Sequence, residues 1–165
     1  MLKYVDTQIT FSEVPDEVAL CINISNCPIH CPSCHSQYLW EDIGTELTEE
    51  TLKSLIEANT GITCVCFMGG DNDVPATNEL SKFVHANYDL HTCWYSGHHA
   101  FPGFEIDFDY VKIGPYIEKF GGLDNPNTNQ RFYIRGRIMN KIDANPHMWY
   151  NITDKFWKNE ENSNN

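Results

Sequence analysis

Three cysteines in a short, proline-containing segment constrain this chain more than any other feature. Residues 27–34 read CPIHCPSC, so Cys27, Cys31 and Cys34 follow the spacing C-x-x-x-C-x-x-C. The two prolines disfavour a regular helix, and a loop lets three thiolates wrap around a compact inorganic centre. Three thiolates on a four-iron cluster leave one iron without a protein ligand and open to substrate. The segment therefore predicts a 4Fe-4S cluster that takes part in chemistry.

Other interpretations of this segment stay open. A zinc site could combine the three thiols with His30 or His35, although closed zinc sites usually pair two separated ligand hooks. Residues 31–35 also match C-x-x-C-H, the attachment pattern of c-type haem, which forms in oxidising compartments. Three unrelated buried thiols are a further alternative, but structural cysteines normally lie in apolar surroundings.

The other four cysteines have a simpler interpretation. Cys21, Cys64, Cys66 and Cys93 all fall in segments that predict strands. Cys64 and Cys66 are two residues apart, so both point to one face of their strand. Free cysteine usually behaves as a small buried residue, and we expect these four to lie in the core.

Apolar runs and helix signals alternate along the first two thirds of the chain. Helix signals begin at Thr48, which can cap a helix that ends at Gly61. The long polar segment 25–46 is predicted to be a functional loop. A second helix is expected over residues 76–87. The expected strands are residues 18–24, 62–68, 91–95, 110–113 and 130–134.

This alternation predicts an α/β fold built from parallel βα units. Parallel strands gather ligand sites at their carboxyl ends. Four unusual segments follow strands and should converge at one edge of the sheet, namely the cysteine loop, Gly69-Gly70-Asp71, Tyr95-Ser96-Gly97 and Gly114-Pro115. The length of 165 residues fits one domain, which we expect over residues 1–155, with a disordered polar tail over 156–165.

Charge and hydropathy argue against a nucleic-acid-binding, membrane-bound or secreted protein. The chain has 11 Lys and Arg against 23 Asp and Glu, a formal net charge of −12. Such an acidic chain is a poor binder of nucleic acid or of anionic membranes. No apolar run approaches the ~20 residues of a membrane-spanning helix, and the N-terminus lacks the apolar stretch of a signal peptide. We therefore expect a soluble, cytoplasmic protein without nucleic-acid or membrane partners.

The motifs taken together resemble a known family. The three-cysteine spacing resembles the radical S-adenosylmethionine (SAM) superfamily, and within it the activating proteins of the anaerobic ribonucleoside-triphosphate reductase. The likeness spans residues 15–134 and depends on the order of its segments. These are Cys27-Pro28 to Cys34-His35, Leu39-Trp40, Gly69-Gly70-Asp71, Tyr95-Ser96-Gly97, Ile113-Gly114-Pro115-Tyr116-Ile117 and Asn129-Gln130-Arg131.

The resemblance implies a fold and an enzyme activity. The fold would be a single-domain partial, open β/α barrel of radical SAM type with about six mostly parallel strands. Cys27, Cys31 and Cys34 would hold the 4Fe-4S cluster, and SAM would chelate the fourth iron. One electron from an external carrier such as a flavodoxin would cleave SAM to methionine and a 5′-deoxyadenosyl radical. That radical would remove a hydrogen atom from a glycine of the partner reductase, which would cover the open side of the barrel.

The same resemblance suggests which residues contact SAM. The carbonyls of Gly69 and Gly70 would meet its ammonium group, with Asp71 standing where much of the superfamily has Glu. Tyr95 and Ser96 would hydrogen-bond its ribose or methionine part.

More peripheral roles fall to other residues. Lys112 or Arg131 could pair with the SAM carboxylate or with the partner, and His35 could orient a cluster sulfur. Ser33 replaces an aromatic residue common in the superfamily before the third cysteine.

Rival functions remain. Another small radical SAM enzyme is possible, either an activator of a pyruvate formate-lyase-like protein or a deazapurine synthase. From other classes, the chain could be an iron–sulfur electron carrier, which would need four cluster ligands and no SAM site, or a zinc-stabilised binding module. The aromatic residues Trp149, Tyr150, Phe156 and Trp157 near the C-terminus could pack on the core or dock a partner.

Overall fold

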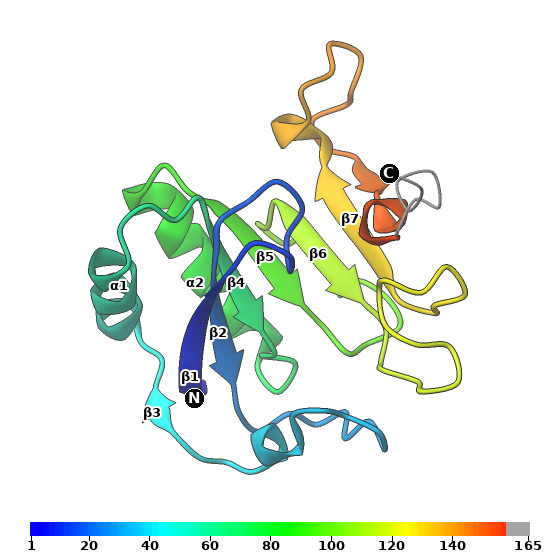
Figure 1. The fold of residues 1–165 in the computed structure, drawn as a ribbon. Coiled ribbons are helices and arrows are strands. Elements are labelled where there is room, and N and C mark those ends of the chain that lie inside the picture. Colours follow the sequence, from blue (N-terminus) through cyan, green and yellow to red (C-terminus); the bar gives the residue numbers. More distant parts are fainter. Residues whose placement is uncertain (158–165) are drawn as a thin grey trace, which may run out of the picture.

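A single mixed sheet organises the computed structural model, which describes residues 1–157 (Figure 1). Its eight strands run in the order β3-β1-β2-β4-β5-β6-β7-β8. The strands are β1 (Lys3–Thr10), β2 (Ala19–Ile24), β3 (Thr45–Glu46), β4 (Cys64–Met68), β5 (His91–Tyr95), β6 (Tyr110–Ile113), β7 (Arg131–Arg135) and β8 (Trp149–Asn151). The helices are α1 (Glu49–Ala58) and α2 (Val74–Asn87), with short 3₁₀ helices over Gln37–Trp40, Gly136–Ile138 and Thr153–Phe156.

The expected partial barrel of mostly parallel strands is wrong. Only the pairs β2–β4, β4–β5 and β5–β6 are parallel, whereas the pairs made by β1, β3, β7 and β8 are antiparallel. A barrel needs a helix after each strand to form an outer ring, and the described chain has two α-helices. No helix lies between β6 and β7, and β7 turns back antiparallel to its neighbour.

The five expected strands and both helices are confirmed within a few residues. The Thr48 hydroxyl accepts the backbone N–H of Thr51 and caps α1, while Asp73 caps α2 through the N–H of Ala76. No helix within residues 1–157 is long and apolar enough to cross a bilayer. Most of the expected tail over residues 156–165 lies outside the described residues.

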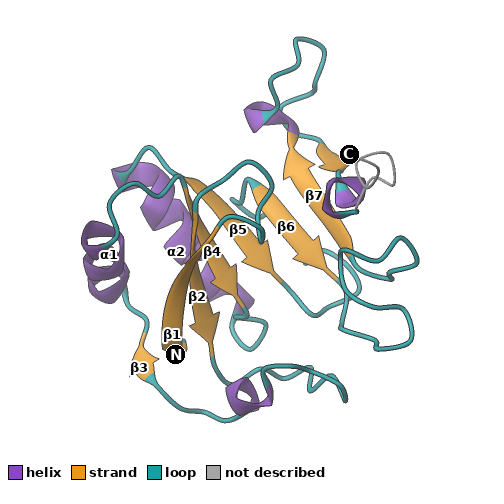
Figure 2. Ribbon diagram, viewed as in Figure 1, coloured by secondary structure: helices purple, strands orange, loops and turns teal. Residues whose placement is uncertain are grey.

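The sheet separates two apolar layers. Both α-helices pack on one face of the sheet (Figure 2). On that face Leu52 and Leu80 of the helices belong to one apolar cluster with Ile22, Val65 and Phe67 of the strands. The opposite face carries the four core cysteines together with Val14, Ala19, Tyr110 and Phe132. Cys21, Cys64, Cys66 and Cys93 are fully buried, as expected. Register places Cys21 beside Cys66 and Cys66 beside Cys93, so sulfur-bearing side chains cross three adjacent strands.

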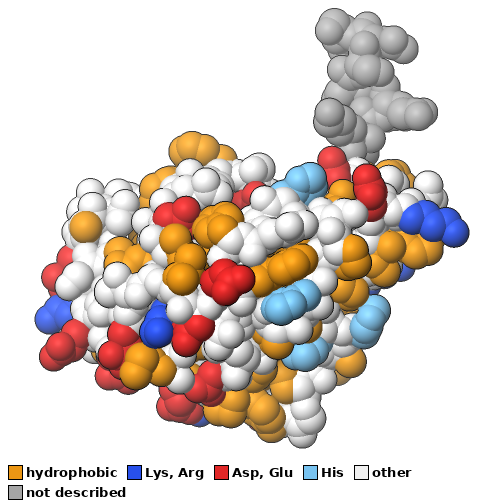
Figure 3. All heavy atoms as spheres, turned by 90° about the horizontal axis from the view of Figure 1, so that it is seen from below, with side chains coloured by type: hydrophobic (Ala, Val, Ile, Leu, Met, Phe, Trp, Pro, Cys, Tyr) orange, Lys and Arg blue, Asp and Glu red, His pale blue; other side chains and the backbone are white. Residues whose placement is uncertain are grey.

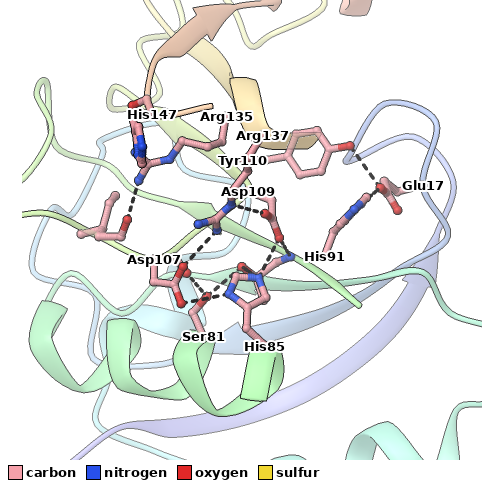
Figure 4. Close-up of polar contacts among 12 residues, drawn as sticks. Glu17, Ser81, His85, His91, Asp107, Asp109, Tyr110, Arg135, Arg137 and His147 are labelled. Carbon is pink, nitrogen blue, oxygen red and sulfur yellow. Dashed lines mark hydrogen bonds and ion pairs between the residues drawn. The ribbon is translucent and has the colours of Figure 1, made fainter. Parts of the chain in front are cut away.

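Ionisable side chains cross-link the amino ends of the parallel strands (Figure 4). The ring nitrogens of His85 lie 2.7 Å from a carboxylate oxygen of Asp109 and 3.0 Å from one of Asp107. Arg137 donates to the same two carboxylates. Close by, Glu17 accepts hydrogen bonds from His91, Tyr110 and Thr63. We call these groups the amino-edge network.

Candidate metal centre

The cysteine loop, residues 26–36, follows β2 at the carboxyl edge of the sheet. Asn26 and His30, the residues before the first two cysteines of the motif, have φ of 59° and 50°. Such angles are uncommon for residues other than glycine and concentrate at functional sites. Backbone hydrogen bonds of 2.9 Å from Asn26 to Glu41 and from Cys27 to Leu39 anchor the start of the loop. The backbone is therefore bent where the thiols are presented.

Aromatic stacking supports the middle of the loop. The His30 ring lies parallel to the Trp40 indole, with centroids 4.7 Å apart and planes 11° apart. Trp40 belongs to the 3₁₀ helix Gln37–Trp40, and its indole nitrogen is buried without a hydrogen-bond partner among residues 1–157. This stacking with Trp40, which lies outside the loop, fixes the position of His30, the residue before Cys31.

The three thiols of the loop differ from the four in the core. Cys27, Cys31 and Cys34 are free and partly exposed, whereas the other four are free and buried. Burial raises the pKa of Cys27, although the backbone N–H groups of Ile29 and His30 favour its thiolate. The N–H of Ser36 donates to the sulfur of Cys34 at 3.4 Å.

This donor set fits an iron–sulfur cluster. Three thiols in one loop, two of them close to backbone N–H donors, supply the soft ligands and N–H···S bonds typical of such centres. Within the described part of the chain, no three His, Cys, Asp or Glu side chains are already gathered around a metal-sized space. Binding would draw the three sulfurs together, and a loop permits that movement.

Segments that follow β5 and β6 touch the cysteine loop. A Cβ placed on Gly97 would lie 2.7 Å from Cγ1 of Ile29, so only glycine allows this approach. The His35 and Tyr116 rings lie 5.2 Å apart, and the Ser33 hydroxyl donates to Glu118 at 2.9 Å. The predicted convergence of the strand-following segments is therefore observed for the loop, the 95–97 turn and the 114–118 segment.

Gly69, Gly70 and Asp71 follow β4 at this edge. Both glycines have positive φ, 118° and 98°, and a Cβ on Gly70 would lie 2.3 Å from the Thr77 hydroxyl. The Gly69 carbonyl accepts the Trp94 indole N–H at 2.9 Å, and the Gly70 carbonyl accepts the Thr77 hydroxyl at 3.1 Å. Each carbonyl has a second lone pair that can accept from a ligand.

Asp71 connects two of the predicted site segments. Its carboxylate accepts the Ser96 hydroxyl at 2.6 Å and the Gly97 N–H at 2.8 Å, and its side chain is 3% exposed. The neighbouring Tyr95 side chain lies on the other face and donates its hydroxyl to the Glu13 carbonyl. Asp71 and Ser96 thus act together, whereas Tyr95 lies apart from them.

The two basic candidates differ in environment. Lys112 is buried, and its ammonium donates to the carbonyls of Ser96 and Gly114. Arg131 pairs in register with Ile113 at the same edge, but its guanidinium donates to the carbonyls of Thr128 and Gln130. Lys112 is therefore a buried charge, whereas the exposed Arg131 contacts backbone carbonyls near its own position in the chain.

A broad cavity of about 1150 Å³ opens beside the cysteine loop. His35 and Tyr116 line it on one side, and Tyr95 lines it from the sheet. Three acidic side chains also line it, Glu13, Asp16 and Asp124, against one lysine, Lys155, which lies 3.6 Å from Asp16. Viewed toward the carboxyl edge, hydrophobic and histidine side chains gather near the middle, and lysine and arginine lie at the margins (Figure 3).

Sequence reasoning missed several contacts at this edge. These contacts join residues that no sequence motif relates to one another. They are the Trp40–His30 stack, the Gly97–Ile29 contact and the Tyr95–Glu13 hydrogen bond. Lys112 stands among the apolar residues of the strand Tyr110–Ile113, and all four positions of this strand are buried. A lysine within such a run could have indicated a buried charge.

Comparison with known proteins gives one family. Neither the curated proteins nor the solved structures contain a match to this chain. A family model described as a 4Fe-4S single cluster domain matches residues 18–105, slightly more than half of the chain. The match includes the cysteine loop, Gly69-Gly70-Asp71 and the 95–97 turn. Its description agrees with the soft donor set of the loop, and the chain belongs to this family of iron–sulfur proteins.

Proposed function

We propose that this iron–sulfur protein is a radical SAM activase that generates the glycyl radical of an anaerobic ribonucleoside-triphosphate reductase. One observation carries the proposal: three free, partly exposed thiols lie in a bent loop at the carboxyl edge of the parallel strands. A cluster with three protein ligands has one iron available to a substrate. A closed electron carrier would need a fourth ligand, and the remaining cysteines are buried in the core.

Each ligand of the loop has a defined place in this proposal. Cys27, Cys31 and Cys34 hold the cluster, with backbone N–H groups stabilising the charge on Cys27 and Cys34. When bound, the cluster supplies the electron that cleaves SAM into methionine and a 5′-deoxyadenosyl radical. The His30–Trp40 stack fixes the bend between the first two ligands.

The residues at the ends of β4 and β5 are proposed to position SAM. The carbonyls of Gly69 and Gly70 each have a free lone pair. The two glycines pack so closely against Ile24 and Thr77 that a Cβ at either position would collide with them. Asp71 holds Ser96 and the Gly97 N–H and so sets the shape of the 95–97 turn. Tyr95 lies apart from these groups, because its hydroxyl donates to the Glu13 carbonyl and its ring lines the cavity near the Lys112 ammonium.

The cavity beside the loop is the proposed place for the partner. A glycine of the reductase must reach the radical, and the cavity of about 1150 Å³ is open and adjacent to His35 of the loop. Its acidic lining favours a partner segment with positive charge. The electron is proposed to come from an external one-electron donor such as a flavodoxin, in the cytoplasm, with neither nucleic acid nor membrane involved.

The proposal is tested by anaerobic reconstitution. Protein with iron and sulfide is given SAM and a strong reductant, with and without the reductase, and 5′-deoxyadenosine is measured together with the glycyl radical signal. Wild type is compared with Cys31→Ala, which removes a proposed ligand, and with the matched control Cys93→Ala, which removes a buried thiol. Product and radical should fall to background in Cys31→Ala and persist in Cys93→Ala.

Other outcomes separate the rival functions. A full iron and sulfide complement without 5′-deoxyadenosine, even with the reductase present, would identify an electron carrier. Zinc without sulfide would identify a zinc module. Product without a glycyl radical would retain SAM cleavage and reject this partner.

A further inference from the structure

A buried positive charge lies at the carboxyl edge of the sheet, held by segments that contact the cysteine loop. Lys112, in β6, is 8% exposed, and its ammonium donates to the carbonyls of Ser96 at 2.9 Å and Gly114 at 3.0 Å. The ammonium also lies 5.5 Å from the centre of the Tyr95 ring. Two of its three protons are thus assigned to backbone carbonyls, and the side chain is fixed.

This charge lacks an ion-pair partner. No carboxylate among residues 1–157 lies within 4.0 Å of the Lys112 ammonium. Burial lowers the pKa of Lys112 to about 8, against the opposing charges of Asp71, Cys31 and Cys27. Burying a charge without an ion pair is costly. An anionic group at this edge would offset that cost.

The loops that hold Lys112 are the ones that touch the cysteine loop. Ser96, whose carbonyl accepts from the ammonium, precedes Gly97, which packs against Ile29 of the cysteine loop. Gly114, the other acceptor, leads into Tyr116, which contacts His35. The ammonium therefore lies between two segments, residues 95–97 and 114–116, and both contact the loop that presents the cluster ligands.

We propose that the Lys112 ammonium is a fixed counter-charge to the cluster and raises its reduction potential. The inference rests on the ligand set proposed above. Three thiolates make the bound cluster anionic, and the added electron makes it more so. A nearby positive charge stabilises the reduced form more than the oxidised form, and local charge is one of the properties that set such potentials. The side chain thus favours uptake of the electron that the proposed reaction needs.

The test is a redox titration of the reconstituted protein, followed by the spectrum of the reduced cluster and made without SAM. Lys112→Met removes the charge and the donors, Lys112→Gln removes the charge but keeps donors, and Lys112→Arg keeps the charge. Lys53→Met, an exposed lysine of α1, is the matched control. At fixed potential we expect the ratio of reduced to oxidised cluster to fall about tenfold in Lys112→Met and Lys112→Gln, which is about 59 mV for a one-electron couple. Lys112→Arg and the control should keep a potential near that of wild type.

The outcomes decide the inference separately from the proposed function. An unchanged potential in Lys112→Met and Lys112→Gln with full iron and sulfide would overturn the inference and leave the ligand set intact. A shift that arises only after SAM is added would also overturn it, because Lys112 would then act through SAM. If Lys112→Met and Lys112→Gln are folded by circular dichroism but hold no cluster, iron binding by Lys112→Arg supports a role for the charge. Absence of iron in Lys112→Arg overturns the inference. Loss of iron in wild type would instead reject the proposed ligand set.

Discussion

The two ends of the parallel strands differ in how their buried ionisable groups are paired. At the amino edge, Asp109 accepts from His85, Arg137 and the backbone of Thr92, so its charge is paired and hydrogen-bonded. At the carboxyl edge, the Lys112 ammonium has only backbone carbonyls, and the three thiols of the cysteine loop are free. At the carboxyl edge Asp71 lies 3.7 Å from His98, but the buried Lys112 ammonium has no carboxylate within 4.0 Å among residues 1–157.

The contrast shows how stability and binding are distributed in this fold. A paired network stabilises the sheet without needing a ligand, because each charge already has its partner. An unpaired buried charge and free thiols lower the stability of the folded protein while no ligand is bound. This is typical of sites where stability is lower for the sake of function. We therefore expect substitutions at the amino edge to affect folding most, and substitutions at the carboxyl edge to affect binding most.

The largest effect on stability is expected for Asp109→Asn. The Asp109 side chain is 4% exposed, and its replacement leaves His85 and Arg137 with Asp107, 30% exposed, as their remaining shared carboxylate. Breaking a buried pair in this way costs about 3 kcal/mol or more. Urea denaturation of the apoprotein measures the loss, with the exposed Asp89→Asn as the control. A loss below ~1 kcal/mol would remove the proposed difference between the two edges.

A smaller effect is expected for Asp71→Asn at the carboxyl edge. The amide can still accept from Ser96, but it cannot replace the second carboxylate oxygen that accepts from Gly97. Loss of a hydrogen bond to a charged group costs about 1.5–3 kcal/mol. The same urea experiment measures it, with the exposed Asp124→Asn as the control. Equal losses for Asp71→Asn and Asp109→Asn would contradict the contrast.

The smallest and most gradual effect is a pH dependence of the amino-edge network. Burial acts against His85, but hydrogen bonds to Asp109 and Asp107 outweigh it and raise its pKa, and the hydrogen bond to Glu17 raises the pKa of His91. The pKa values of Glu17 and Asp109 are lowered, because their hydrogen-bond partners outweigh burial. The histidine contributions are complete below about pH 6.5 and are lost as pH rises through the raised values. The carboxylate contributions are complete above about pH 4.3 and are lost as pH falls through the lowered values.

Thermal unfolding of the apoprotein should therefore give its highest Tm between about pH 4.3 and 6.5. In His85→Gln the decline on the alkaline side should become shallower, whereas the exposed His99→Gln should follow wild type. An alkaline limb that is identical in all three proteins would assign the pH dependence to groups outside the amino-edge network.

Local elements of this fold were predictable from the sequence. Thr48 and Gly61 bracket a helix by capping chemistry, and the apolar runs around Cys66 and Cys93 have the length and composition of buried strands. These signals are local, because each depends on residues within one turn or one strand. The thiol spacing is equally local, and it pointed to the iron–sulfur family that the comparison gives.

Strand direction and remote contacts were not predictable in this way. The run 130–134 has the composition of a strand, but nothing in it tells whether the strand runs parallel or antiparallel to its neighbour. Strand β1, which lies between β3 and β2, was missed because its exposed and half-buried residues lack an apolar run. Lys112 resembles a surface lysine in sequence, and its burial is fixed by Ser96 and Gly114 from separate loops.

The sorting of the seven thiols into two environments has a consequence for air-damaged protein. Oxygen and peroxide attack accessible thiolates first, and Cys27, Cys31 and Cys34 are free and partly exposed when no cluster is bound. The row of sulfurs at Cys21, Cys66 and Cys93 is buried and closed to the same reagents. Damage is thereby confined to a segment outside the core, so thiol reduction followed by iron and sulfide should repair the protein without unfolding it.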